Sequence, residues 1–199
     1  MITKNINELN KPCLPVSSIE EGEEIAAKLL NELTNSKNGV GLAANQIGIQ
    51  KRVCVVNVKE PVVLINPKII DKSEETFVFP EGCLSFPNKH VRTTRNVEIT
   101  VQADNYESKL VFSADSKDIK DALECACIQH EIDHLDGITM FDRQFIPKPI
   151  IRKSEKIGRN EKVKIKNGSE TKVLKYKKAE PLLKTGWEII WKKMKKKIM

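Results

Sequence analysis

The chain has 199 residues, of which 40% are apolar and 31% are charged, a balance typical of a soluble globular protein with its own core. No apolar run approaches the roughly 20 residues that span a bilayer, and the first residues lack the hydrophobic segment of a secretory signal. These features exclude membrane insertion, and we expect a cytoplasmic protein. The five cysteines are an odd number, so they do not predict a disulfide scaffold.

Charge is unevenly distributed along the chain. Residues 1–147 hold 16 Lys/Arg against 22 Asp/Glu, a net charge of −6, whereas residues 148–199 hold 18 against 5, a net charge of +13. We therefore expect an acidic main domain over residues 1–147 and a basic C-terminal extension over residues 148–199.

The main domain opens with a helical pattern. Ser18 and Glu21 form a capping-box pattern, and apolar residues follow at helical spacing to residue 34. Residues 39–48 place three glycines among small residues, which predicts a loop with its backbone close to a ligand and no regular element. β-rich runs then predict an antiparallel or mixed sheet from residues 53–58, 62–65, 75–79, 97–103 and 108–113.

A second helix is predicted over residues 115–135, because apolar residues return there on one broad face and Asp136-Gly137 supplies a stop. Its position after the strand-forming runs makes it the central helix of the domain.

The basic segment is also expected to fold. β-rich runs flank Asn167-Gly168, a strong hairpin signal, and a short helix is predicted over 179–183 with Pro181 in its first turn. The runs are 162–166 and 171–176, and 187–191 predicts a third strand. Leu174, Trp187 and Ile190 are the expected core of this small unit.

The segment that indicates chemistry is His130-Glu131-Ile132-Asp133-His134. Residues four apart lie on one face of a helix, so both imidazoles can reach the same metal ion. Glu131 lies one position along, where it can serve as general base for a metal-activated water. Two histidines that make only hydrogen bonds are the alternative, but two of the three histidines in the chain take this spacing.

A catalytic metal site needs a third protein ligand and an open position for water. Cys83 follows a predicted strand, where its thiolate can point at the helix while Gly82 allows close backbone approach. Cys83 is therefore the best third ligand. The remaining thiols are expected to be small buried hydrophobic groups: Cys13, Cys54, Cys125 and Cys127.

Three segments, in this order and spacing, resemble the signature motifs of the peptide deformylases: residues 39–46 (GVGLAANQ), 81–85 (EGCLS) and 129–134 (QHEIDH). The resemblance covers roughly residues 12–147. It implies an α+β fold with antiparallel or mixed sheets around a central metal-binding helix, to which the basic C-terminal extension adds a β-hairpin. It also implies a hydrolase of protein biosynthesis that removes the formyl group from the initiator N-formylmethionine of new polypeptides.

The resemblance further implies the roles of individual residues. Cys83, His130 and His134 would bind one metal ion, and Glu131 would be the general base. The Gln46 side-chain amide and the Leu84 backbone N–H would donate to the formyl oxygen as it gains charge, although Gln46 could instead only brace its loop. Three charged groups are expected to orient the ligands without acting as catalysts: Glu81, Arg95 and Asp133.

The substrate pocket follows from matching positions. A wall for the methionine side chain is expected from Val40, Gly41, Phe79, Gly82, Leu123 and Cys127, with ordinary core packing as the alternative for its apolar members. Lys89, His90 and Arg92 are expected along the rim of the cleft. The Cys/His/His donor set suits zinc, iron(II), cobalt or nickel, and the resemblance implies Fe²⁺ as the physiological ion.

Two other functions remain open from the sequence. A zincin-like metallopeptidase would normally draw its third ligand from beyond His134, where the chain offers Asp136 and Asp142 but no histidine. A catalytically silent, ribosome-associated module would keep the fold as a scaffold only.

The expected partners are N-formylmethionyl nascent peptides and, through the basic tail, the ribosome and its RNA, with neither membrane nor DNA. A solvated, solubilising face is the alternative interpretation of the tail. Its basic residues include Arg152, Lys153, Lys156, Arg159, Lys162, Lys164, Lys166, Lys172, Lys175, Lys177 and Lys178.

Overall fold

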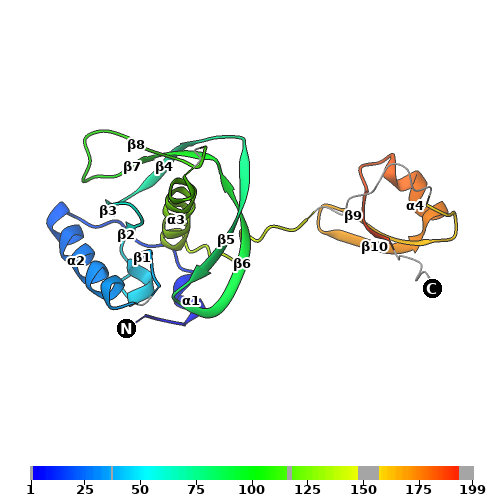
Figure 1. The fold of residues 1–199 in the computed structure, drawn as a ribbon. Helices are drawn as coiled ribbons and strands as arrows, with labels where there is room; N and C mark the ends of the chain where they lie inside the picture. The colour runs from blue at the N-terminus through cyan, green and yellow to red at the C-terminus, as the bar shows by residue number, and fades with distance from the viewer. Residues whose placement is uncertain (1, 37, 116–117, 148–156, 193–199) are drawn as a thin grey trace. The chain divides into compact units, whose positions relative to one another are not determined.

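The computed structural model describes residues 2–36, 38–115, 118–147 and 157–192. It divides the chain into two compact units, Met1–Phe145 and Ile146–Met199, each of which is described by itself (Figure 1). The division lies two residues before the expected boundary at residue 147. Arg152, Lys153 and Lys156 of the expected basic segment lie outside the described residues.

The first unit begins with two helices, α1 (Ile6–Leu9) and α2 (Ile19–Asn35). The Ser18 hydroxyl accepts a hydrogen bond from the Glu21 N–H at 3.2 Å, as a capping box predicts. The Glu21 carboxylate, however, accepts from the Ser17 N–H at 2.8 Å, one residue earlier than the pattern predicts. The α2 face with Ile25, Leu29 and Leu33 is buried.

The glycine-rich stretch was expected to be a loop throughout, and this expectation is wrong. It contains strand β1 (Gly41–Ala43) and the short 3₁₀ helix η1 (Ala44–Ile47). Leu42 and Ala43 are fully buried and pair with Val55 and Cys54, so packing and strand pairing outweigh the glycine content. The sheet runs in the order β1-β2-β3 with β2 (Val53–Asn57) and β3 (Pro61–Ile65).

A second sheet and a long hairpin complete the strands of this unit. The sheet has the order β4-β7-β8, formed by β4 (Lys68–Lys72), β7 (Glu98–Gln102) and β8 (Leu110–Ser113). The hairpin pairs β5 (Thr76–Cys83) with β6 (Phe86–Asn96). All paired strands in the described sheets are antiparallel, so the mixed alternative does not apply to them.

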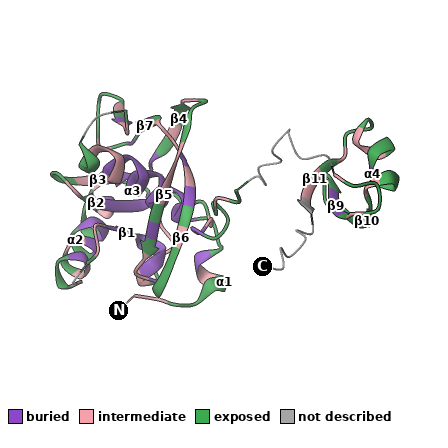
Figure 2. Ribbon diagram, turned by 45° about the vertical axis from the view of Figure 1, so that its right-hand side comes forward, coloured by how far each residue is buried: buried purple, intermediate pink, exposed green. Residues whose placement is uncertain are grey.

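Helix α3 (Ile119–Leu135) lies at the centre of the unit, with the first sheet on one side and the hairpin on the other (Figure 1). It begins after Asp118, four residues later than predicted, because the Asp118 carboxylate caps the Lys120 N–H. Every residue from Glu124 to Leu135 is buried (Figure 2). The helix therefore carries its polar side chains into the interior, where each needs a partner.

Gly137 explains how the helix ends. Its φ of 74° lies in the left-handed region, as the predicted stop requires. A Cβ atom at this position would lie 2.7 Å from the backbone oxygen of Asn10, so only glycine lets the N-terminal segment approach the end of α3.

The second unit has one antiparallel sheet, in the order β10-β9-β11, packed against α4. Its elements are β9 (Lys162–Asn167), β10 (Glu170–Lys175), α4 (Tyr176–Leu183) and β11 (Glu188–Lys192). Asn167 pairs with Glu170, so the hairpin loop is Gly168-Ser169, one residue beyond the predicted pair. Helix α4 begins at Tyr176, which places Pro181 in its interior and contradicts the expected first-turn position.

The core of the second unit is small. Val163, Ile165 and Ala179 are fully buried, and Leu174 and Trp187 pack against them as expected. Ile189 takes the core position predicted for Ile190, because alternate residues of a strand share a face and Ile189 lies two residues after Trp187. Over the described residues of both units, no helix is long and apolar enough to cross a membrane.

Candidate metal centre

Three potential ligand atoms converge between β5 and α3. Cys83 ends β5, and His130 and His134 stand four residues apart on α3. The His134 Nε2 atom lies 3.1 Å from His130 Nε2 and 3.3 Å from Cys83 Sγ. All three ligand atoms lie within 4.8 Å of one another.

The donor set fits a tetrahedral metal ion. Metal–nitrogen bonds of about 2.05 Å and a metal–sulfur bond of about 2.3 Å at tetrahedral angles separate two nitrogens by about 3.3 Å and nitrogen from sulfur by about 3.6 Å. The observed separations of 3.1 and 3.3 Å are close to these lengths. Three protein ligands leave a fourth position for water or substrate, which is typical of a catalytic site.

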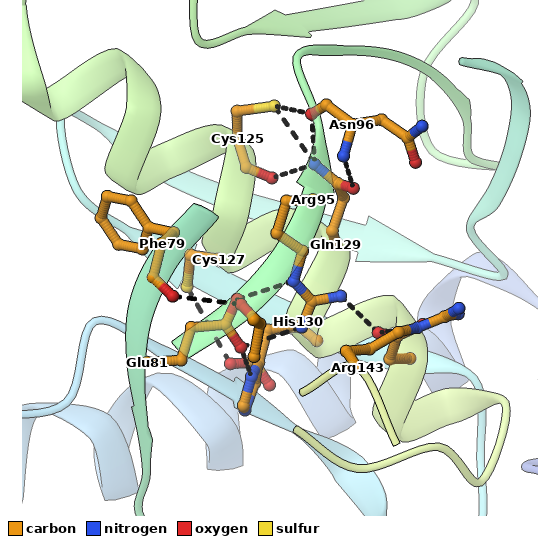
Figure 3. Close-up of polar contacts among 12 residues, drawn as sticks. Phe79, Glu81, Arg95, Asn96, Cys125, Cys127, Gln129, His130 and Arg143 are labelled. Atoms are coloured by element: carbon orange, nitrogen blue, oxygen red, sulfur yellow. Dashed lines mark hydrogen bonds and ion pairs between the residues drawn. The ribbon is translucent and has the colours of Figure 1, made fainter. Parts of the chain in front are cut away.

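His130 is oriented by a buried carboxylate. Its Nδ1 atom lies 2.9 Å from Glu81 Oε2 (Figure 3). This contact leaves Nε2 free to face the other two ligands. Arg95 donates to both oxygens of Glu81, at 2.6 and 2.9 Å, and Thr93 donates to Oε1 at 2.7 Å. Burial raises the pKa of Glu81, but the bonds with Arg95 and His130 outweigh burial and lower that pKa to about 2.

The network continues through Asp133 to a second arginine. Arg95 also donates to Asp133, and Arg143 donates to both Asp133 oxygens at 3.0 and 2.7 Å. The positive charge of Arg95 is therefore shared by two buried carboxylates, and the paired guanidinium has a pKa above its ordinary value despite burial. Arg143 follows α3 in a segment where no sequence pattern indicated a role.

The two histidines differ in their surroundings. Burial and the neighbouring His130 lower the pKa of His134 well below its ordinary value, which favours the neutral ring that a metal ligand must be. Burial also lowers the pKa of His130, but its bonds to Cys83 and Glu81 outweigh burial and raise it. A bound metal ion would take the place of the proton on His130 in these contacts. The ion would then supply the positive charge next to Cys83 and Glu81.

Glu131 lies beside the ligands and in the cavity wall. It is buried, and burial raises its pKa to about 7. Its Oε2 atom has no hydrogen-bond partner among the described residues. Gly41 makes room for it, because a Cβ atom there would lie 2.5 Å from Glu131 Oε1. A buried carboxylate in a cavity wall, with one oxygen that has no hydrogen-bond partner, is suited to accept a proton from a bound reactant.

Gln46 and Leu84 approach the same place from the other side. The Ala43 N–H donates to Gln46 Oε1 at 2.9 Å, which fixes the direction of the side-chain amide. Gln46 Nε2 donates to Ser85 Oγ at 3.1 Å and lies 3.4 Å from Cys83 Sγ. Both Gln46 and Leu84 line the cavity.

The cavity beside the ligands has a volume of about 470 Å³, within the range of small-molecule sites. Every residue expected in the pocket wall lines it: Val40, Gly41, Phe79, Gly82, Leu123 and Cys127. Lys89 and His90 line its mouth. Arg92 does not line it, because its guanidinium lies 5.8 Å from the centre of the Phe145 ring.

Several supporting residues were not predicted as such. Ser85 is buried against Gln46, and Asn45 donates to the backbone oxygen of His134 at 2.6 Å. Both stand inside the motif segments, so their position was a usable signal. No sequence pattern indicated the roles of Thr93 and Arg143, because their partners Glu81 and Asp133 lie 12 and 10 residues away along the chain.

The remaining thiols do not belong to the cluster of metal ligands. Cys13, Cys54, Cys125 and Cys127 are all buried. Burial raises the pKa of Cys13 and of Cys125 to about 11, and it also raises the pKa of Cys54 and Cys127 well above the ordinary value of a thiol. Of the five thiols, only Cys83 is half-buried and placed beside both histidines.

Comparisons with known proteins agree with this geometry. A sequence model of the family described as Polypeptide deformylase matches residues 1–149. A curated peptide deformylase from Natranaerobius thermophilus is 42% identical over 139 residues, covering 68% of this chain and 85% of the relative. The second unit lies almost entirely beyond the matched residues.

Solved structures show the same likeness. A peptide deformylase from Thermotoga maritima superposes with a TM-score of 0.60 at 34% identity, covering 70% of this chain and 92% of that one. A probable peptide deformylase from Synechococcus phage S-SSM7 gives a TM-score of 0.61 at 33% identity, covering 72% of this chain and 98% of that one. Both superpositions cover nearly the full length of the neighbour.

Proposed function

The chain belongs to the polypeptide deformylase family, a family of metal-dependent hydrolases that remove the N-formyl group from newly synthesised polypeptides, and we propose how its own residues perform this reaction. Cys83, His130 and His134 bind one divalent metal ion, and Glu131 is the general base. The convergence of three ligand atoms within 4.8 Å, next to a buried carboxylate, is the observation that supports this assignment.

Glu131 moves the proton. The formyl carbonyl is a poor electrophile and water a poor nucleophile, and a bound divalent metal lowers the pKa of water and polarises the carbonyl. Glu131 accepts the proton of the attacking water and returns it to the leaving amine. Burial raises the pKa of this carboxyl, which helps it to keep the proton between accepting it as a base and returning it as an acid.

Gln46 and Leu84 stabilise the charge that develops on the formyl oxygen. Ala43 holds the Gln46 amide so that its N–H₂ group faces Cys83, and the Leu84 backbone follows Cys83 directly. Donors fixed before the reaction cost no reorganisation when the carbonyl oxygen becomes negative. Gln46→Ala is expected to lower kcat more than it raises KM, with unchanged metal content.

The apolar wall of the cavity receives the methionine side chain. Val40, Phe79, Leu123 and Cys127 offer a hydrophobic surface beside the ligands. Leu123→Trp should fill this space and raise KM for formyl-methionyl peptides. Unchanged kinetics would place the side-chain pocket elsewhere.

Iron(II) is the proposed physiological ion, with zinc, nickel and cobalt as possible occupants of the same donor set. The test is anaerobic preparation, metal analysis, and formyl release from formyl-Met-peptide measured per bound metal. Cys83→Ser should lose metal and activity together. Retention of metal would favour a zincin-like ligand set with a downstream residue, and bound metal without formyl release would favour a catalytically silent module.

The second unit is proposed to contact ribosomal RNA, which would bring a cytoplasmic deformylase to nascent chains. One sheet face carries Lys162, Lys164, Lys166 and Lys175, here called the lysine face. Lys162 pairs with Lys175 across β9 and β10, so their side chains share a face. The intervening Val163 and Ile165 are fully buried in the core that includes Ala179 of α4.

The lysine face suits a polyanion. Residues 157–192 hold ten Lys/Arg against four Asp/Glu, a net charge of +6. Lys162, Lys166 and Lys175 are exposed, and Lys164 is half-buried. Phosphates bound by such a face release counterions, so binding should fall steeply with salt.

A charge-removal series tests this role. The test variant combines Lys162→Gln, Lys164→Gln and Lys166→Gln, and its co-sedimentation with ribosomes should be weaker. The slope of the logarithm of the binding constant against the logarithm of the salt concentration should fall by about one unit for each phosphate that the protein no longer binds. The control removes the same amount of charge from helix α4 and the residue that follows it, through Lys177→Gln, Lys178→Gln and Lys184→Gln. Equal effects of both sets would indicate a general charge effect, and no effect of either would leave the lysine face as a solubilising surface.

A further inference from the structure

The mouth of the catalytic cavity carries positive charge. Lys89 and His90 of β6 line it, and both residues are exposed. Among the described residues that line the cavity, the carboxylates are Glu81 and Glu131, and both are buried. Glu81 is already paired with Arg95 and His130. The charge that an incoming peptide meets first is therefore positive, although residues 1–147 as a whole carry a net charge of −6.

Local structure holds Lys89 at this place. Asn88 turns the chain with a φ of 65°, and the Phe86 and Phe141 rings pack edge to face with centroids 5.0 Å apart. Lys89 Nζ lies 5.7 Å from the centroid of the Phe141 ring, a cation–π distance. Among the described residues, no carboxylate forms an ion pair with Lys89. Its charge is therefore available to a ligand.

The Lys89 backbone lies beside the residue that precedes the metal ligand Cys83, because a Cβ atom at Gly82 would lie 3.9 Å from the Lys89 backbone oxygen. His90 pairs with Gly82, the residue before Cys83, and a Cβ atom at Gly82 would lie 3.3 Å from His90 Nδ1. Neighbouring strands lie about 4.8 Å apart, and an extended peptide covers about 7 Å in two residues. A substrate whose formyl group lies at the ligands thus brings its second residue to the level of Lys89.

We propose that Lys89 makes the enzyme select formylated chains with an acidic side chain directly after the initiator methionine. The inference rests on the proposed function of this cavity, and it adds a preference that the apolar pocket cannot supply. Lys89 acts on the substrate carboxylate and takes no part in the proton transfer. A lysine at the second position of the substrate is disfavoured by the same charge.

The preference should be modest and salt-dependent. Exposed ion pairs contribute about 0.2–1 kcal/mol, which corresponds to roughly 1.4- to 5-fold in kcat/KM. At 1 M salt the screening length falls to about 3 Å, so most of this preference should disappear. A preference that arises from shape would survive high salt.

The experiment compares three amidated peptides on the full-length, metal-loaded protein: formyl-Met-Asp-Ala-amide, formyl-Met-Asn-Ala-amide and formyl-Met-Lys-Ala-amide. Amidation removes the terminal carboxylate, so only the side chain differs in charge. The wild-type protein should show the highest kcat/KM for the Asp peptide and the lowest for the Lys peptide at low salt. Lys89→Gln should bring the ratio of kcat/KM for the Asp peptide to kcat/KM for the Lys peptide close to one, and Lys89→Arg should retain the wild-type ratio.

Lys28→Gln, an exposed lysine on α2, is the matched control and should leave the ratio unchanged. A wild-type ratio of one, a ratio that Lys89→Gln does not change, or a ratio that high salt leaves intact would overturn the proposal. The uncharged Asn peptide separates this failure from failure of the proposed function, because its formyl group is released whenever the enzyme is a working deformylase.

Discussion

Helix α3 and strand β9 both carry many charged or polar residues, but they place them in opposite environments. In α3, His130, Glu131, Asp133 and His134 are all buried. In β9, lysines alternate with the buried Val163 and Ile165 and point to the other face of the sheet. The function of the buried groups of α3 depends on particular partners at fixed distances. The function of the exposed lysines of β9 depends on the number and sign of their charges.

Substitution of Glu131 tests the buried side of this comparison with the largest expected effect. Glu131→Gln keeps the shape of the site but removes the proton acceptor, so kcat for a formyl-Met-peptide should fall by about 10²- to 10⁴-fold. Metal content should stay at the wild-type level. Glu23→Gln, at an exposed position of α2, should leave kcat unchanged. Normal turnover by metal-loaded Glu131→Gln would remove Glu131 from the mechanism.

Arg95 tests how far buried partners determine stability. Arg95→Met leaves Glu81 and Asp133 without their shared cation, and breaking such a buried pair costs about 3–5 kcal/mol in the free energy of unfolding. Urea unfolding of the metal-free protein measures this loss. Arg143→Gln is the control, because the Arg143 side chain is 44% exposed and its loss should cost less. Equal stability of the Arg95 variant and the wild type would show that Glu81 and Asp133 find other partners.

The same contrast decides what the sequence could predict. Helices α2 and α3 follow from apolar periodicity, and the ligand pair follows from the i, i+4 spacing of His130 and His134, because both are local properties. Strand β6 was missed because its residues are mostly polar and few of them are buried, so no apolar alternation indicates a strand.

Long-range partners lie beyond local patterns. Glu81 meets Arg95 only because β5 and β6 pair in one register, and Arg143 meets Asp133 only because the segment after α3 folds back. The charge of these residues was visible in the sequence, but their distances were set by tertiary structure. The family resemblance supplied residue roles that spacing alone left open, among them those of Gln46 and Leu84.

Cysteine labelling tests burial without mutation. Burial raises the pKa of Cys13 and Cys125 to about 11, so at pH 8 only about one thiol in a thousand is ionised. Because both thiols are also almost fully shielded from solvent, their labelling at pH 8 should be slow in the folded protein and should become fast on unfolding in urea. Half-buried Cys83 should react first in metal-free protein and be protected by metal. Equal labelling of Cys83 with and without metal would contradict its role as a ligand.

Removal of residues 148–199 tests the exposed side of the comparison and should have the smallest effect. The ligands, Glu131 and the cavity wall all belong to Met1–Phe145, and solved deformylases match this unit over nearly their full length. The truncated enzyme should therefore hydrolyse short formyl-peptides with kcat/KM within about twofold of the full chain. The urea midpoint of the catalytic unit should also be unchanged. A large loss of peptide hydrolysis would show that the basic unit takes part in the reaction. The assignment of hydrolysis to the buried groups of the first unit alone would then be wrong.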